Sequence, residues 1–260
     1  MKKFKHKKSL GQNFLKNNEI INKIVNSVSV SEKDLIIEIG PGHGILTEAL
    51  KILNANLICY EVDERLKKYL DKFNDEKTKI IYNDFLKTDI TSDIKIINYE
   101  NIYIVANIPY YITTPIIEHI IDSKIDVSRM ILMVQNEVAN RICAKPKSKA
   151  YGSLTVYLNY FFEIEKLFVV DRKEFDPIPN VDSAVISLKK RVNKYDVKNE
   201  EVFFKLITDS FKQKRKTIKN NLFNYDINLI EEILVKNNLS LKSRAEEINI
   251  DVFVEISNSI

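Results

Sequence analysis

Short apolar runs alternate with helix-like stretches through the first half of the chain. Stretches such as 45–53 and 63–73 mix apolar and polar residues, and they lie between runs that are almost entirely apolar. Strands that alternate with helices indicate an α/β domain with a mostly parallel sheet, and near-continuous apolar strands fit a sheet covered on both faces. The predicted strands are residues 35–39, 57–61, 79–82, 102–106 and 130–134.

The end of the chain carries a different pattern. From Glu200 onward, apolar residues recur at three- and four-residue steps, which is typical of amphipathic helices. A last strand is predicted at 183–190, before a polar link. We therefore predict an α/β domain over residues 1–190, beginning with a basic tail at 1–10, and a small helical domain over 191–260.

Composition narrows the class of protein. Apolar residues make up 45% and charged residues 29% of the 260, an ordinary globular mixture. The sequence contains no run of about 18 apolar residues, so no membrane span is predicted. The N-terminus lacks the apolar stretch of a secretory signal. Cys59 and Cys143 have no paired spacing, which indicates a reduced, cytoplasmic protein. The three histidines have no metal-ligand spacing, so we expect no metal.

The positive charge is unevenly distributed, although the net charge is only +4. Five lysines lie within the first eight residues, and a second basic run at 211–222 contains no acid. Either run alone is compatible with a solvated helix face or a tail. Two such runs favour a polyanionic partner such as RNA. The candidate phosphate-binding residues in the second run are Lys212, Lys214, Arg215 and Lys216.

One special residue follows each of the first four predicted strands. These residues are Gly40, Glu61, Asp84 and Asn107, and their intervals are 21, 23 and 23 residues (61−40, 84−61, 107−84). Turns collect such residue types for ordinary reasons. The near-equal spacing instead favours a binding site, because the carboxyl edge of an open α/β sheet is where ligands bind.

The side chains at this edge suggest an adenosine ligand. The glycines at Gly40 and Gly42 let the backbone turn tightly and approach a ligand, but residues 38–47 have neither the dinucleotide pattern nor the Lys-Ser/Thr of a phosphate loop. Glu61 can accept hydrogen bonds from two ribose hydroxyls, and Asp84 can accept one from an adenine amine. S-adenosylmethionine, which joins adenosine to a sulfonium amino acid, fits this set.

Several sequence motifs occur in a specific order and spacing along the chain. They are "QNFL" (12–15), "EIGPGHGILT" (38–47), "NIPYYITTP" (107–115), "YGSLTV" (151–156), "FDPIPNVDSAV" (175–185), "FKQKRKTIKNNL" (211–222) and "RAEEI" (244–248). Through these motifs the chain resembles the ribosomal RNA adenine dimethyltransferases over nearly its whole length. The resemblance is greatest to the housekeeping branch that dimethylates two adjacent adenosines near the 3′ end of small-subunit RNA. It implies a Rossmann-like, S-adenosylmethionine-dependent methyltransferase domain with a helical RNA-binding domain.

The resemblance also implies roles for individual residues. Asn13 and Leu15 would close over the cofactor, and Gly40 would line its methionine part. Gly42 and Asn107 would also bind the cofactor. Glu61 would bind its ribose and Asp84 its adenine. The target base would be held by the residues from Asn107 to Tyr110, and Phe175 would pack against it.

The motif "NIPYY" has a physical explanation within that function. Asn107 offers a side-chain oxygen, and Pro109 biases Ile108 towards an extended backbone whose carbonyl can face the pocket. Tyr110 can stack on an extruded base. The simpler alternative is a Pro-Tyr turn that ends a strand. Tyr111 stands where the family often has asparagine, and Asn159 where it usually has glutamine, so the rim of the predicted pocket departs from the family pattern.

Three other functions remain open from the sequence. A sister branch dimethylates large-subunit RNA and confers antibiotic resistance, and an assembly factor could keep the fold without the chemistry. A nicotinamide oxidoreductase lacks the right glycine pattern. Under the favoured interpretation the partner is small-subunit ribosomal RNA or an immature small subunit, and the protein acts as a monomer.

Overall fold

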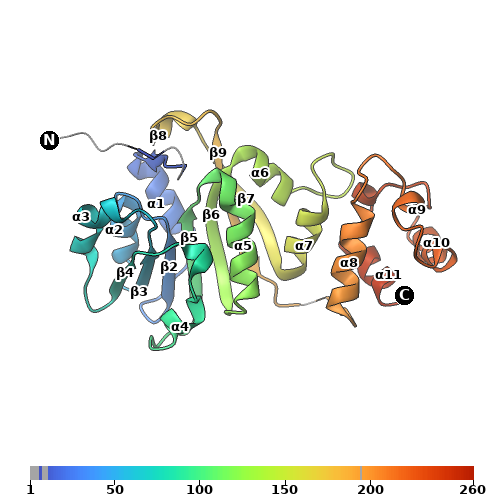
Figure 1. Cartoon of the computed structure of the whole chain (residues 1–260), viewed down its shortest axis with the longest axis horizontal. Coiled ribbons are helices and arrows are strands. Elements are labelled where there is room, and N and C mark those ends of the chain that lie inside the picture. The colour runs from blue at the N-terminus through green and yellow to red at the C-terminus, as the bar shows by residue number, and fades with distance from the viewer. Residues whose placement is uncertain (1–5, 8–10, 194) are drawn as a thin grey trace. The chain divides into compact units, whose positions relative to one another are not determined.

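A computed structural model describes residues 6–7, 11–193 and 195–260 of the chain (Figure 1). The chain divides into two compact units by its internal contacts. The first comprises Met1–Ala139 and Glu165–Lys189, and the second Asn140–Ile164 and Lys190–Ile260. A boundary near residue 190 was expected from the sequence, whereas residues 140–164 were placed in the first domain. The division of function between the two parts stays a prediction.

A seven-stranded sheet forms the centre of the first unit, with strand order β4-β3-β2-β5-β6-β9-β7. The five strands predicted in the first half of the chain are all present, and they pair in parallel. The late predicted strand is present as β9, antiparallel to β6. The strands are β2 (Leu35–Ile39), β3 (Asn56–Tyr60), β4 (Thr78–Ile81), β5 (Ile102–Asn107), β6 (Val127–Gln135), β7 (Phe162–Val170) and β9 (Ser183–Lys190).

The strand order reverses direction at β2. The chain runs from β2 outward through β3 to β4 and then returns to place β5 on the other side of β2. Ile39, the last residue of β2, is in register with Tyr60 of β3 and Ala106 of β5. The carboxyl ends of these strands therefore meet at one point of the sheet edge, the place where open α/β folds bind ligands.

Helices connect the strands, and an apolar core lies between the sheet and these helices. All five residues of β2 are buried, which explains why that strand is apolar apart from Glu38. The stretch 63–73, expected to be one helix, instead contains a short helix with a 3₁₀ turn before it and another after it. The helices of this unit are α1 (Asn18–Asn26), α2 (Ile45–Lys51), α3 (Lys67–Leu70), α4 (Ile90–Ile94) and α5 (Thr113–Asp122), and α6 (Asn136–Ile142) crosses into the second unit.

The second unit is helical and has a core of its own. α8 packs against α7 and α11, and Phe203, Ile230 and Phe253 are fully buried in the shared core. Tyr160 of α7 joins this core and donates its hydroxyl to Glu200. The helices are α7 (Ser153–Phe161), α8 (Glu200–Ser210), α9 (Ile218–Asn221), α10 (Ile227–Lys236) and α11 (Ile250–Ser257).

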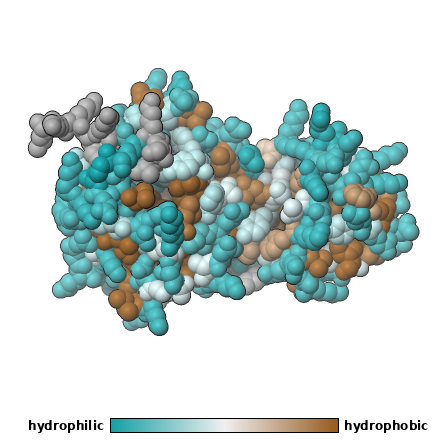
Figure 2. Space-filling model, viewed as in Figure 1, coloured by the Kyte–Doolittle hydropathy of each residue, from teal (hydrophilic) through white to brown (hydrophobic). Residues whose placement is uncertain are grey.

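The surface is mixed in character. On the face shown in Figure 2, hydrophilic residues cover much of the surface and hydrophobic residues show through in separate groups. Within the described ranges, no helix has both the length and the apolar character needed to cross a membrane.

Candidate active site

One open pocket collects the four residues that the spacing singled out. Gly40, Glu61, Asp84 and Asn107 all line it, each just after or at the end of a parallel strand. The cavity measures about 800 Å³, including the solvent at its mouth.

The glycine-rich loop forms one wall with backbone alone. Gly40 and Gly42 have φ values of +71° and +59°, a region that other residues rarely adopt. A Cβ on Gly42 would lie 2.7 Å from the Phe14 ring, so a side chain there would displace Phe14. The nearest atom to a Cβ on Gly40 is the Asn107 carbonyl oxygen at 3.9 Å, and the loop therefore leaves open space in front of β5.

Glu61 is a buried carboxylate, 5% exposed, with two fixed hydrogen bonds. Its Oε2 accepts from the Gly42 backbone N–H at 3.1 Å, and its Oε1 accepts from the Asp63 N–H at 2.8 Å. Burial raises the pKa of Glu61, and the two backbone donors oppose that shift. Each oxygen keeps a further acceptor position, so the carboxylate can receive two neighbouring hydroxyls.

Asp84 lies at the start of a short 3₁₀ turn after β4. Its Oδ1 accepts from the Leu86 backbone N–H at 3.1 Å, which fixes the carboxylate at the rim of the pocket. Lys87 lies 4.0 Å from its other oxygen. Asn83 and Phe85 line the pocket on either side, so a planar ring near Asp84 would meet both polar and aromatic neighbours.

Asn107 and Ile108 supply oxygens at the end of β5. The Asn107 amide nitrogen donates to the Asn13 carbonyl at 3.1 Å. The Ile108 N–H donates to the Met133 carbonyl at 3.1 Å, while no donor among the described residues reaches the Ile108 carbonyl oxygen. Pro109, with φ −55° and ψ 133°, carries the chain away in extended form. An oxygen without a donor at a pocket wall is an available acceptor.

The two tyrosines of this motif have different environments. The Tyr110 hydroxyl lies 2.9 Å from Ser183 Oγ, and burial raises its pKa. This contact fixes the Tyr110 ring against the pocket that it lines. Tyr111 is 60% exposed, and its ring lies 3.1 Å from where a Cβ on Gly11 would be.

A stretch near the N-terminus, Gly11–Phe14, forms another wall of the same pocket. We refer to it as the N-terminal segment. Phe14 and Leu15 form the two-residue strand β1, which pairs antiparallel with β8 (Phe175–Asp176). Both Asn13 and Leu15 were expected to close over the cofactor. Asn13 lines the pocket, whereas Leu15 is buried in the apolar core.

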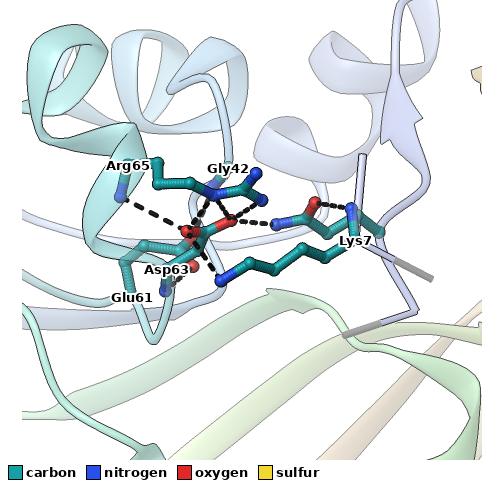
Figure 3. Close-up of polar contacts among 6 residues, drawn as sticks. Lys7, Gly42, Glu61, Asp63 and Arg65 are labelled. Atoms are coloured by element: carbon teal, nitrogen blue, oxygen red, sulfur yellow. Dashed lines mark hydrogen bonds and ion pairs between the residues drawn. The ribbon is translucent and has the colours of Figure 1, made fainter. Parts of the chain in front are cut away.

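Asp63 anchors the N-terminal segment, and the sequence alone did not reveal its role. Arg65 contacts its carboxylate with two nitrogens, at 2.8 Å and 2.6 Å, and Gln12 donates to it at 2.8 Å (Figure 3). The Lys7 ammonium lies 3.9 Å away. The hydrogen bonds from Arg65 hold the pKa of Asp63 well below its usual range. This buried charge is therefore paired on several sides.

Phe175 does not line the pocket. Its side chain is 1% exposed within the apolar core, in register with Leu15. The strand alternation at β8 directs it inward, because its neighbour Asp176 is exposed. The prediction that Phe175 packs against the target base therefore has no support in this conformation. Ile178 and Val181, 61% and 44% exposed, are accessible apolar residues of the same loop.

The four basic candidates lie together in the second unit. Lys212, Lys214, Arg215 and Lys216 are exposed in the turn between α8 and α9, which we call the basic turn. The Lys214 ammonium donates to the Lys149 carbonyl, so a further lysine lies beside them. Of the basic tail at 1–10, only His6 and Lys7 are described, and the other lysines of that prediction lie outside the described residues.

Two remaining expectations concern metals and the pocket rim. In the described part of the chain, no three His, Cys, Asp or Glu side chains lie close enough to hold a metal ion. Asn159 belongs to α7 of the second unit, where its amide donates to the Thr155 carbonyl at 2.7 Å.

Comparison with known proteins gives consistent results over the full length. The family model described as ribosomal RNA adenine dimethylase matches residues 3–260. A relative from Fusobacterium nucleatum is 44% identical over 97% of both chains, and one from Enterococcus faecalis is 40% identical over 99% of this chain and 91% of its own. Both are named ribosomal RNA small subunit methyltransferase A.

Two solved structures share the fold. A dimethyladenosine transferase from Plasmodium falciparum aligns with a TM-score of 0.77 at 24% identity, covering 94% of this chain and 95% of its own. The 23S rRNA methyltransferase ErmE aligns with a TM-score of 0.75 at 24% identity, covering 94% and 98%. The expected Rossmann-like α/β fold is thereby confirmed.

Proposed function

The chain belongs to the ribosomal RNA adenine dimethylase family, and from this membership we propose that it methylates small-subunit ribosomal RNA. The atoms modified are the exocyclic amines of two adjacent adenosines near the 3′ end, and the modification belongs to small-subunit biogenesis in the cytoplasm. The small-subunit names of the relatives support this choice of RNA. One observation carries the proposal: acceptors suited to a ribose and acceptors suited to an amine face the same pocket.

S-adenosylmethionine is the proposed methyl donor, because the pocket residues fit its parts. Glu61 would hold the ribose hydroxyls with its remaining acceptor positions, and Asp84 would hold the adenine amine. The space in front of Gly40, where no side chain intrudes, would receive the methionine part. When bound, this donor supplies an electrophilic methyl group carried on a sulfonium sulfur.

Asn107 and Ile108 would activate the target amine. The lone pair of an adenine amine is delocalised into the ring, so the amine is a poor nucleophile. Positive charge grows on this nitrogen as it forms its new bond to carbon, and oxygen acceptors at its hydrogens stabilise that charge. The Ile108 carbonyl, which has no described donor, and the Asn107 side-chain oxygen are the two acceptors at this wall.

Tyr110 would hold the base in place. Its hydroxyl is held at Ser183, so the ring has a fixed orientation while still lining the pocket. An extruded base gains stacking energy on such a ring, and the electron-rich face favours a neighbouring cation. Phe175 has no part in this proposal, because its side chain lies in the core.

The basic turn would supply affinity without chemistry. Four exposed cations in one turn match the phosphate backbone of RNA, which gives binding strength and little sequence information. The second unit would thus bind the RNA, and the first unit would carry out the methyl transfer.

Mass spectrometry of ribosomal RNA tests this function. Small subunits and large-subunit RNA that lack the modification are incubated separately with the protein and isotope-labelled S-adenosylmethionine, and the RNA is then digested to nucleosides. We expect labelled dimethyladenosine from the small subunit alone. Label in the large-subunit RNA would assign the chain to the resistance branch, and its absence from both would identify a non-catalytic binding protein.

A further inference from the structure

We propose that the N-terminal segment is a working part of the catalytic site, because it orients the Asn107 amide, and that Asp63 is the positioning residue that holds the segment in place. This inference rests on the proposed methyl transfer. It assigns a role to Gln12 and Asp63, neither of which contacts the reacting atoms.

The first step concerns the direction of the Asn107 amide. Its nitrogen donates to the Asn13 carbonyl oxygen at 3.1 Å, and a carbonyl oxygen can only accept. The opposite orientation would place two oxygens against each other and would turn the NH₂ group towards the target amine. The Asn13 carbonyl thus selects the orientation in which Asn107 Oδ1 is left for the pocket.

The second step concerns what holds Asn13 there. Gln12, the preceding residue, uses both ends of its side chain: its nitrogen donates to Asp63 Oδ2 at 2.8 Å, and its oxygen accepts from the Lys7 backbone N–H at 2.8 Å. Gly11 packs closely against Pro109, since a Cβ on Gly11 would lie only 3.3 Å from the Pro109 side chain. The segment is therefore fixed at both walls of the pocket.

The third step links this anchor to the cofactor side. Asp63 is 2% exposed and donates its own N–H to Glu61 Oε1 at 2.8 Å. Its carboxylate is already fixed by Arg65, as Figure 3 shows, so it offers Gln12 a rigid acceptor. A chain of contacts consequently runs from Glu61 through Asp63 and the N-terminal segment to Asn107.

This chain of contacts has a functional consequence. Displacing the N-terminal segment uncovers the pocket and, in the same movement, removes the acceptor that orients Asn107. The amine-binding oxygens are then aligned only while the segment covers the pocket. A segment that served cofactor binding alone would affect the cofactor affinity and leave the rate at saturation unchanged.

Single-turnover kinetics of Gln12→Ala and Asp63→Asn provide the main test. We expect the rate at saturating S-adenosylmethionine to fall about tenfold in each, since misplacement of a reacting group by about 1 Å costs up to roughly 10²-fold. The double variant should be no slower than the slower single variant, because Asp63→Asn weakens the charge-assisted hydrogen bond whose donor Gln12→Ala deletes. The matched control is Glu64→Gln, which removes an exposed carboxylate on the same turn whose partner is Lys67.

Hydrogen exchange of the protein without cofactor gives an independent measurement. The peptide covering residues 11–16 should exchange at least about threefold faster in Gln12→Ala than in the parent, because a local anchor has been removed. Glu64→Gln should leave this peptide unchanged. Unchanged exchange in Gln12→Ala, or an unchanged rate at saturating cofactor, would overturn the inference. A parent that transfers no methyl group would overturn the proposed function instead. The exchange data would then still show whether Gln12 holds the N-terminal segment in place.

Discussion

The pocket of the first unit and the basic turn of the second carry charge in opposite ways. Glu61 and Asp63 are buried, and each of their carboxylate oxygens accepts a hydrogen bond from a specific donor. The cations from Lys212 to Lys216 are exposed on a turn. Catalysis needs groups fixed to within fractions of an ångström, whereas phosphate binding needs only a sufficient density of charge. Substitutions in the pocket should therefore change the transfer rate or the cofactor affinity, whereas substitutions in the basic turn should change the RNA affinity.

The largest effect is expected at Asn107. Asn107→Ala removes one preorganised acceptor, and we expect the single-turnover methyl-transfer rate to fall by about 10²-fold or more. RNA affinity, measured by filter binding, should stay within about twofold, because base contacts of this kind contribute little compared with phosphates. Near-parental transfer by this variant would remove the distinction between the two regions.

Glu38 makes the first unit sensitive to pH. This buried side chain accepts from Thr47 and Cys59, and burial raises its pKa from 4.5 to about 7. Between these values the folded state holds more protons than the unfolded state, so stability falls as pH rises from 4.5 to 7. In the parent, this titration should lower the free energy of unfolding by about 3 kcal/mol over that range. We expect Glu38→Gln to lack this decrease, as measured by urea unfolding at several pH values. Parallel pH curves for parent and variant would contradict this.

A substitution at Glu61 should change cofactor binding without changing RNA binding. Glu61→Ala deletes a charged acceptor, and hydrogen bonds to charged groups are worth about 1.5–3 kcal/mol. We therefore expect S-adenosylmethionine to bind roughly 10- to 150-fold more weakly in calorimetric titration. RNA affinity should not change. Unaltered cofactor affinity in a folded variant would exclude Glu61 from the binding site.

The smallest effect at moderate salt is expected in the basic turn. A triple alanine variant at Lys212, Arg215 and Lys216 should bind RNA roughly tenfold more weakly and lower the log–log salt slope by about 2–3 units, close to one per lost phosphate contact. Its cofactor affinity should match the parent. Salt curves that coincide would mean that the turn is only a solvated surface. The control is a triple alanine variant of exposed lysines in the first unit, Lys33, Lys79 and Lys95.

The four pocket residues found from the regular spacing share one property: each lies at the end of a parallel strand or shortly after it. Regular βα spacing placed Gly40, Glu61, Asp84 and Asn107 at one edge because a parallel sheet brings the ends of its strands together. The spacing carried no such information about Gln12 and Asp63, which are 51 positions apart and meet through side chains alone.

Local ambiguity accounts for the other differences. The resemblance implied that Phe175 packs against the target base, but pairing of β8 with β1 turns its side chain inward, and such long-range pairing leaves no local signal. The strand β7 went unpredicted because its apolar and charged residues alternate irregularly, and only two of its nine residues are buried. The helix expected at 63–73 is divided into short turns, since Asp63 caps the first of them while binding Arg65.

The path of the chain between the two units limits how the protein can be shortened. The chain leaves the first unit after Ala139, returns at Glu165 and leaves again after Lys189, so no single cut separates the units. A truncation at residue 190 would retain α7 while deleting the helices that bury Val156 and Tyr160. The shortened protein would display an apolar helix to solvent and would tend to aggregate. Isolating the catalytic unit therefore requires excision of residues 140–164 with a short linker in their place, and not a simple C-terminal deletion.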